Sequence, residues 1–172
     1  MKDVTIVGAT GAVGAELRAI LADRGVGASN LRLFASPRSA GRLLEHRGAS
    51  IVVESADAAC IRAAFEESDV VFLAATAEAS RRLAPIAVAS SCVVIDNSSA
   101  FREDPDCPLV ACGVNDSVLD GFAGPGVIAN PNCSTIIALA AIAPLRRLGR
   151  LLRMTVCTYQ AISGAGAEAM EE

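Results

Sequence analysis

The stretch that decides the fold lies at the start of the chain and reads Val4-Thr5-Ile6-Val7-Gly8-Ala9-Thr10-Gly11-Ala12-Val13-Gly14. Its apolar beginning predicts a buried strand, and Ala15 to about Asp23 predicts a helix. The glycines between them permit a tight turn and let backbone N–H groups approach a pyrophosphate at the helix N-terminus. The spacing is G-x-x-G-x-x-G rather than the commoner G-x-G-x-x-G, so a glycine-rich turn without a ligand is the alternative. The place of the turn, directly after the first strand, favours nucleotide binding.

Strands and helices alternate along the chain beyond this turn. The apolar runs predict strands at 31–35, 50–54, 69–75, 92–96 and 126–129. The helical spacing predicts helices at 56–67 and 77–89, with Pro85 kinking or splitting the second. This order predicts an α/β fold, a doubly wound (Rossmann-type) parallel sheet with helices on both faces. Because ligands bind beyond the carboxyl ends of such strands, the loops 8–14, 36–42, 74–76 and 97–102 are candidate binding loops.

The loop after the second strand indicates which dinucleotide binds. It reads Ser36-Pro37-Arg38-Ser39-Ala40-Gly41-Arg42. NAD sites usually place an acid roughly 20 residues after the glycines, where it bonds the ribose 2′-OH. This loop has hydroxyls and guanidinium groups instead, which suit the 2′-phosphate of NADP. The alternative is an ordinary solvated basic loop.

A second cluster of polar residues surrounds Cys133, in the stretch Asn130-Pro131-Asn132-Cys133-Ser134-Thr135. We predict a helix from Cys133 to about Leu148, with the asparagines forming the entry turn and the cap. Backbone N–H groups and the helix dipole favour a thiolate at that position, and a thiolate there is a nucleophile for an electrophilic carbonyl. The alternative is a small apolar residue that starts a core helix.

Two further segments complete the set of candidates. The loop Asp96-Asn97-Ser98-Ser99-Ala100-Phe101-Arg102 leaves a strand end, and its arginine offers a planar fork to phosphate or carboxylate. The alternative is a polar loop with Asx turns. Leu151 to Ala161 is apolar and rich in β-branched residues, which predicts a strand.

Composition narrows the class of protein. With 172 residues the chain can bury one sizeable core and the start of a second domain. Only 3% of the residues are aromatic and the positive charge is scattered, which argues against a nucleic-acid partner. No apolar run reaches membrane-span length and no secretory signal is evident, so we expect a cytoplasmic enzyme. The six cysteines are then free thiols, and their spacing from the single histidine makes a metal site improbable.

Taken together, these segments resemble aspartate-semialdehyde dehydrogenases. The resemblance rests on the glycine turn, Ser39-Ala40-Gly41, the 96–102 loop, the 130–135 stretch, and Thr158-Tyr159-Gln160 through Ser163-Gly164-Ala165-Gly166. They occur in the family's order and reach the last part of the chain. N-acetyl-gamma-glutamyl-phosphate reductases share the fold and a nucleophilic cysteine, but their cysteine segment differs from Asn-Cys-Ser-Thr, so they are the second choice.

The resemblance implies a reaction and a set of residues. Cys133 would attack aspartyl phosphate and hold a thioester, which NADPH reduces to the semialdehyde, a precursor of lysine, threonine and methionine. Gln160 would orient the substrate near the sulfur, and Arg102 and Asn132 would hold phosphate. The residues implied to contact NADP are Thr10, Gly11, Ala12, Val13, Ser36, Arg38, Ser39, Ser163 and Gly164. The complete family enzyme is expected to be a homodimer.

The chain also departs from the family pattern. The family continues through a substrate and dimerisation domain that supplies an acid–base histidine, whereas His46 here matches no catalytic position. Residues 1–128 are expected to form the NADP-binding domain and residues 129–172 the start of an α+β catalytic domain. We expect this chain alone to bind NADP weakly without turnover. The alternatives are a non-catalytic NADP-binding module or partner subunit, and a truncated, aggregation-prone product.

Overall fold

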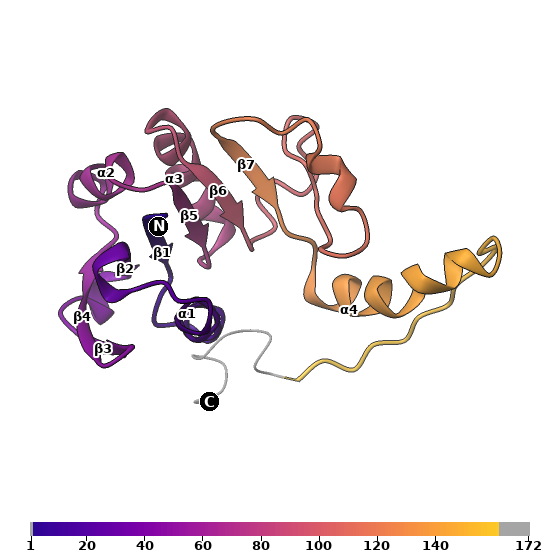
Figure 1. Ribbon diagram of the computed structural model, residues 1–172, viewed down its shortest axis with the longest axis horizontal. Coiled ribbons are helices and arrows are strands. Elements are labelled where there is room, and N and C mark those ends of the chain that lie inside the picture. Colours follow the sequence, from indigo (N-terminus) through magenta and orange to yellow (C-terminus); the bar gives the residue numbers. More distant parts are fainter. Residues whose placement is uncertain (1, 162–172) are drawn as a thin grey trace.

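A computed structural model describes residues 2–161 of the chain (Figure 1). Seven strands form one sheet in the order β3-β4-β2-β1-β5-β6-β7. All neighbouring strands are parallel except β3 and β4, which are antiparallel. The strands are β1 (Val4–Val7), β2 (Leu31–Ala35), β3 (Leu43–His46), β4 (Ala49–Ser55), β5 (Val70–Leu73), β6 (Val93–Asp96) and β7 (Gly126–Ala129).

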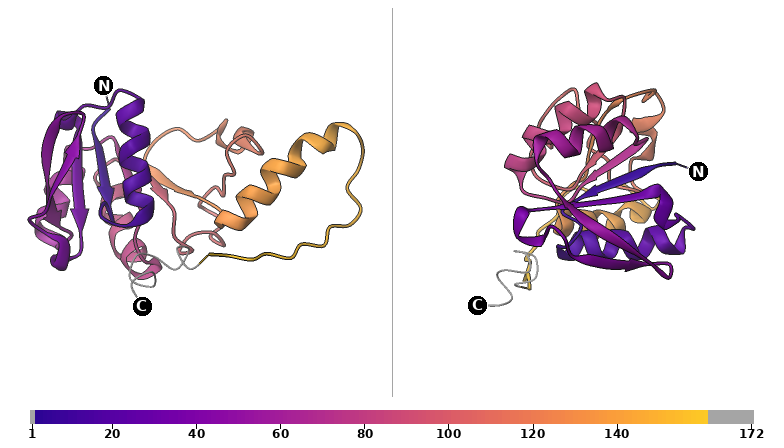
Figure 2. Two further views of the ribbon diagram at one scale, coloured as in Figure 1. Left: turned by 90° about the horizontal axis from the view of Figure 1, so that it is seen from below. Right: turned by 90° about the vertical axis from the view of Figure 1, so that its left-hand side faces the viewer.

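Helices cover both faces of this sheet, which confirms the predicted doubly wound α/β fold. The α-helices are α1 (Ala12–Asp23), α2 (Ala58–Glu66), α3 (Ala77–Ala89) and α4 (Cys133–Ile142). Short 3₁₀ turns lie at η1 (Ala28–Asn30), η2 (Pro37–Ser39), η3 (Asp116–Leu119) and η4 (Ala143–Arg147). Figure 2 shows α1 on one face of the sheet, with α2 and α3 on the other.

Two hydrophobic cores hold these layers together, because successive side chains of a strand point to opposite faces. In β1, Ile6 belongs to the core under α1, which Leu17 and Leu21 help to cover. The next residue, Val7, belongs to the core under α2 and α3. Both are almost fully buried. Strands that are buried on both faces need continuous apolar runs, which explains the character of residues 4–7.

The edge hairpin β3–β4 was not predicted from the sequence. Arg47 and Gly48 connect its strands with φ angles of 51° and 79°. A two-residue turn with both φ angles positive matches the twist of a hairpin, and its usual signal is Asn-Gly or Asp-Gly. Arg-Gly does not carry that signal. His46 anchors the hairpin, because its Nε2 lies 2.9 Å from the carbonyl oxygen of Val26 and donates to it.

Three further expectations are corrected by the structure. The segment Leu151–Ala161 is exposed and has no strand assignment, because no neighbouring strand in residues 2–161 pairs with it. The helix predicted to reach Leu148 ends as an α-helix at Ile142 and continues as η4, where Pro144 supplies no N–H to the helical ladder. Pro85 does not split α3, which is one helix from Ala77 to Ala89.

The α4 region projects from the sheet body. Figures 1 and 2 show α4 leading away from β7, and the segment after η4 returning alongside it towards the sheet. None of the helices in the described residues is long and apolar enough to cross a membrane.

Candidate active site and nucleotide cleft

The parallel topology gathers the candidate loops at one edge of the sheet. β1, β2, β5, β6 and β7 run in the same direction, so the loops after their last residues share that edge. The chain leaves β1 for β2 on one side and returns to β5 on the other, which makes the β1/β5 junction the switch point of the sheet. Ligands of open α/β sheets bind at such a point.

The three glycines of the first turn differ in whether packing within the protein requires glycine at their positions. A Cβ atom on Gly8 would lie 2.1 Å from the carbonyl oxygen of Ala74, and one on Gly14 would lie 2.2 Å from that of Gly8. These two glycines let the turn pack against β5 and against the start of α1. A Cβ on Gly11 would lie 3.5 Å from the Gly8 oxygen, which is an ordinary contact. Packing within the protein therefore does not require glycine at Gly11.

Gly11 is the N-cap of α1, and no side chain caps this helix. The N–H groups of the first helical turn have no partner within the helix, and they carry the positive end of its dipole. Ala12 and Val13 occupy this turn and are exposed. An anion is therefore favoured at this end of α1, and a glycine there lets it approach closely.

A cleft of about 360 Å³ opens beside this turn. Its walls come from the loops after β1, β2, β4 and β5 and from α3. It is lined by Val7, Gly8, Thr10, Gly11, Ala35, Ser36, Pro37, Ala56, Asp57, Ala74, Ala75, Thr76, Ala79, Arg82 and Leu83. Of the predicted NADP contacts, Thr10, Gly11 and Ser36 line the cleft directly.

The remaining predicted NADP contacts lie around this cleft or outside the described part of the chain. Ser39 lies beside the cleft, where its Oγ accepts a hydrogen bond of 3.4 Å from Thr10 Oγ1. Arg38 is exposed on η2, between Ser36 and Ser39. Ser163 and Gly164 lie outside the described residues.

The loop after β6 is tied to the loop after β7 through Arg102. Its Nε donates to the carbonyl oxygen of Asn130 at 3.0 Å, and one terminal nitrogen donates to that of Asn97 at 3.2 Å. Asn130 also donates through Nδ2 to Asn97 Oδ1 at 2.8 Å. A guanidinium has five N–H donors, so these two bonds orient the group and leave donors for an anion.

Asp96 fixes the base of the same loop. Its side chain is fully buried, and its carboxylate accepts hydrogen bonds of 2.7 Å from Ser80 Oγ and from Ser98 Oγ. The backbone N–H of Ser98 also donates to it, at 3.2 Å. A buried carboxylate with three donors is well satisfied, and it holds the chain at the point where it turns towards Arg102.

Cys133 is the first residue of α4, and its side chain is exposed. Asn132 is the N-cap, and its Oδ1 accepts from the backbone N–H of Ser134 at 3.0 Å. Pro131 is buried and anchors the entry to the helix. The sulfur therefore lies at the N-terminal end of α4, beside backbone N–H groups that have no partner within the helix.

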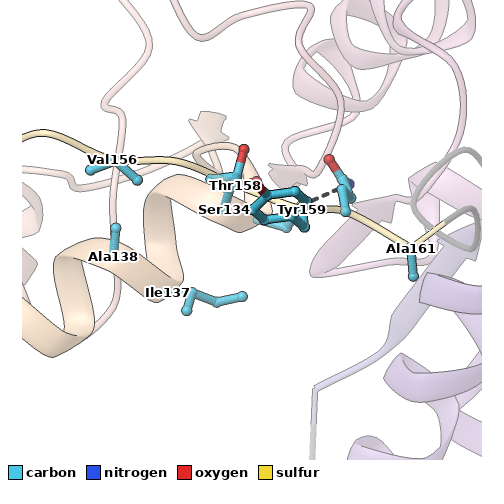
Figure 3. Close-up of a pocket in the computed structure, with 9 residues that line it drawn as sticks. Ser134, Ile137, Ala138, Val156, Thr158, Tyr159 and Ala161 are labelled. Atoms are coloured by element: carbon cyan, nitrogen blue, oxygen red, sulfur yellow. Dashed lines mark hydrogen bonds between the residues drawn. The ribbon is translucent and has the colours of Figure 1, made fainter.

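Gln160 reaches Cys133 from the returning segment, although the two are distant in sequence. Its Nε2 donates to Sγ over 3.6 Å, which is the dashed line of Figure 3. A cavity of about 490 Å³ lies between α4 and this segment. Figure 3 shows Ile137 and Ala138 on the helix side and Val156 and Tyr159 on the segment side. The Gln160 amide and the Cys133 sulfur thus lie in one open pocket, and both side chains are exposed.

A family model for the NAD-binding domain of semialdehyde dehydrogenases matches residues 3–122. The chain belongs to the semialdehyde dehydrogenase family. The match covers the glycine turn, the nucleotide cleft and the Arg102 loop, and it ends before Cys133.

Curated and solved relatives extend the similarity past Cys133. A Synechocystis protein named aspartate-semialdehyde dehydrogenase is 45% identical over 98% of this chain and 48% of its own length. The structure of Vibrio cholerae aspartate semialdehyde dehydrogenase II complexed with ASA has a TM-score of 0.89 and 37% identity, over 99% of this chain and 50% of that one.

The enzyme of Candida albicans, solved with NADP, has a TM-score of 0.69 and 27% identity over 86% of this chain and 47% of that one. The chain thus spans about half the length of the relatives it matches.

Three polar residues of the cleft were not named from the sequence as contacts. Asp57 follows β4, Thr76 is the N-cap of α3, and Arg82 lies in the second turn of α3. The strand-end rule selected the loop of Thr76 but not the residue. Asp57 was missed because the prediction extended the helix back to residue 56, whereas α2 begins at residue 58.

Two other cysteines have environments that suppress thiolate formation. Burial, with Asp69 nearby, raises the pKa of the Cys92 thiol above its ordinary value. Burial and then the charge of Asp104 raise the pKa of Cys107. Cys92 donates to the carbonyl oxygens of Phe65 and Ser68, which is the behaviour of a structural thiol. Among the described residues, no three His, Cys, Asp or Glu side chains are grouped so that they could hold a metal ion.

Proposed function

We propose that this chain carries the dinucleotide site and the nucleophile of an NADP-dependent aspartate-semialdehyde dehydrogenase. The observation that supports the proposal most directly is the pairing of Cys133 Sγ with Gln160 Nε2 at 3.6 Å, at the N-terminus of α4. The names of the relatives favour this reaction over that of N-acetyl-gamma-glutamyl-phosphate reductase. The physiological setting we propose is a cytoplasmic homodimer in lysine, threonine and methionine biosynthesis.

The first chemical step belongs to Cys133. Its thiolate attacks the acyl carbon of aspartyl phosphate, the bond from that carbon to the phosphate oxygen breaks, and phosphate leaves with the electron pair. The products are a thioester on Sγ and free inorganic phosphate. Covalent capture divides one difficult substitution into two easier steps. The backbone N–H groups at the start of α4 would stabilise the developing oxyanion.

Three side chains would hold the substrate for attack by the sulfur. Arg102, oriented by its bonds to Asn97 and Asn130, binds the phosphate through its remaining N–H donors. Asn132 contributes its side-chain amide from the N-cap position, and Gln160 orients the acyl group beside the sulfur. All three are proposed roles that rest on these positions.

The cleft beside the glycine turn fits NADPH, because the first turn of α1 has N–H groups without a capping side chain. When bound, NADPH would supply a hydride to the acyl carbon of the thioester; the C–S bond would then break, giving the aldehyde and returning Cys133 Sγ as the thiolate. Gly11, Ala12 and Val13 would bind the pyrophosphate, and Thr10 the adjoining part of the dinucleotide. Ser36, Arg38 and Ser39 would bind the 2′-phosphate through hydroxyl and guanidinium donors, and Ser163 and Gly164 complete the proposed set.

Among the described residues, no histidine is placed to act as the general acid–base group of the reaction. His46, the single histidine of the chain, is buried on β3, at the edge of the sheet opposite β7. General acid–base groups typically contribute about 10²–10⁴-fold to a rate. We therefore propose that the 172-residue chain binds NADPH and captures an acyl group but does not turn over at enzymatic rates.

Peptide mass spectrometry tests the proposed nucleophile and substrate together. The 172-residue chain is incubated with aspartyl phosphate or with N-acetylglutamyl phosphate, quenched in acid and digested. The expected result is an aspartyl adduct on the peptide that contains Cys133, with little adduct from the second compound. Absence of the aspartyl adduct, or a preference for the N-acetylglutamyl group, would contradict the proposal. The variant Cys157→Ser is the matched control, since Cys157 is also exposed.

A further inference from the structure

The nucleotide cleft contains two charged side chains that the proposed NADP contacts do not use. Most of its wall is apolar, with Ala35, Ala56 and Leu83 among the lining side chains. Among the described residues that line it, only Asp57 and Arg82 carry a charge. A mostly apolar cleft with one hydrogen-bond acceptor and one planar cation has the chemistry of a site for a flat heteroaromatic ring.

The order of the strands places Asp57 at the far end of the cleft, and Arg82 lines the same cleft from α3. The loops leave the sheet in the spatial order β4, β2, β1, so Asp57 follows the strand two places from the glycine turn. Ser36 follows β2, the neighbour of β1, where the ribose of a dinucleotide is bonded. A dinucleotide with its pyrophosphate at Gly11 and its ribose at Ser36 brings its base towards the β4 loop.

The Asp57 carboxylate is held in place for an external partner. Ser55 Oγ donates to its Oδ2 at 2.8 Å, which fixes the orientation of the group. Asp57 is the N-cap of α2, yet its side chain makes no capping hydrogen bond. The carboxylate is thus not engaged in stabilising the helix. An ionised carboxylate only accepts hydrogen bonds, so the ligand must present a donor.

We propose that Asp57 selects adenine at this end of the cleft by accepting a hydrogen bond from the exocyclic amino group, while Arg82 packs its guanidinium plane over the ring. This inference rests on the proposed function, because it assumes that a dinucleotide occupies the cleft. A carboxylate repels a ring that carries a carbonyl oxygen at the position of the amino group. Stacking by Arg82 depends on the ring and little on that substituent.

The experiment compares NADPH with its hypoxanthine analogue, in which a carbonyl replaces the exocyclic amino group. Binding of each to the 172-residue chain is measured by calorimetry. Losing a hydrogen bond to a charged group is expected to weaken the analogue about tenfold or more in the unmodified chain. Asp57→Ala should remove most of this preference. Asp57→Asn should narrow or reverse it, because the new amide can donate to the carbonyl oxygen. Asp120→Asn, at an exposed residue away from the cleft, should leave the preference unchanged.

Arg82 gives an independent test of the ring placement. Arg82→Ala should weaken NADPH and the analogue by the same factor, about threefold to tenfold. The neighbouring Arg81→Ala is the matched control, because Arg81 is exposed on the same helix and does not line the cleft. Unequal loss of the two dinucleotides, or no loss in Arg82→Ala, would contradict the stacking role.

Binding of NADH, as a third ligand, distinguishes a contact of Asp57 with the base from a contact with the ribose. If Asp57 bonded the ribose 2′-OH, Asp57→Asn would change the ratio of NADPH to NADH affinity and leave the adenine preference intact. That outcome overturns the inference while the proposed function stands. Absence of NADPH binding to the unmodified chain overturns both. The predicted pattern is a changed adenine preference with an unchanged NADPH-to-NADH ratio.

Discussion

One added methyl group distinguishes the glycines that build the turn from the glycine that admits the ligand. In Gly14→Ala the new Cβ would lie 2.2 Å from the carbonyl oxygen of Gly8, and close to the Ala9 backbone at 2.7 Å. Backbone atoms cannot move aside as a flexible side chain can. In Gly11→Ala the nearest atom is 3.5 Å away, at ordinary contact distance.

These distances set the expected magnitudes. Alanine gains about 1 kcal/mol over glycine inside a helix, but overpacking costs about 1–3 kcal/mol and more against rigid backbone. We therefore expect Gly14→Ala to lose about 2 kcal/mol or more of unfolding free energy. Gly11→Ala changes an N-cap, where alanine is less favourable than glycine, so a loss within about 1 kcal/mol is expected. Its Cβ occupies the space into which the pyrophosphate must come, so NADPH affinity should fall about tenfold or more.

Urea denaturation followed by circular dichroism measures the first effect, and NADPH fluorescence titration measures the second. The chain contains no tryptophan, so the nucleotide signal is free of that background. A Gly14→Ala variant as stable as the unmodified chain would contradict the packing role of Gly14. A Gly11→Ala variant that keeps its stability and also binds NADPH with unchanged affinity would contradict the ligand-binding role of Gly11.

Three more perturbations test other parts of the site and the fold. Cys133→Ser should abolish the acyl adduct while NADPH binding stays nearly intact; an adduct that persists on another cysteine would identify a different nucleophile. Arg38→Glu should weaken NADPH about tenfold or more and NADH much less, since a phosphate contact becomes a repulsion, and equal weakening in titrations would undo the 2′-phosphate assignment. The hydrogen bond from Lys2, and then that from the N–H of Asp3, lowers the pKa of Asp69. Ionised Asp69 therefore stabilises the fold above its unfolded-state pKa of about 4, and this stabilisation is lost as the pH falls through the lower pKa of the folded state. Lys2→Met should therefore reduce the loss of stability below about pH 4 in urea titrations, and an unchanged acid limb would contradict this.

The parallel sheet and the edge that carries the loops could be predicted from local patterns. Residues 4–7 and 93–96 are strands at the predicted places, because a strand buried on both faces must be apolar throughout. The glycine turn could also be predicted. Its reason is local packing, because there is no room for a side chain at Gly8 or Gly14. These features depend on neighbours that are close in sequence or on the general rules of α/β topology.

The features that were missed depend on contacts between distant segments. Asp57 lines the cleft only because β4 lies next to β2, and Arg82 only because α3 starts from the loop after β5 at the same edge. The partner of Asp96, Ser80, comes from α3, and no sequence pattern links the two. The segment Leu151–Ala161 is rich in residues that favour strands, but no strand lies beside it in the described residues. The strand predicted there from β-propensity alone was therefore wrong.

We propose that this chain forms a dinucleotide site and carries the nucleophile, while its single histidine, His46, does not supply the acid–base step. The most direct measurement monitors phosphate-dependent reduction of NADP with aspartate semialdehyde, and NADPH binding, in one sample of the 172-residue chain. We expect NADPH binding without turnover at enzymatic rates. Turnover by the purified chain would contradict the acid–base argument, and failure to bind NADPH would contradict the assignment of the cleft.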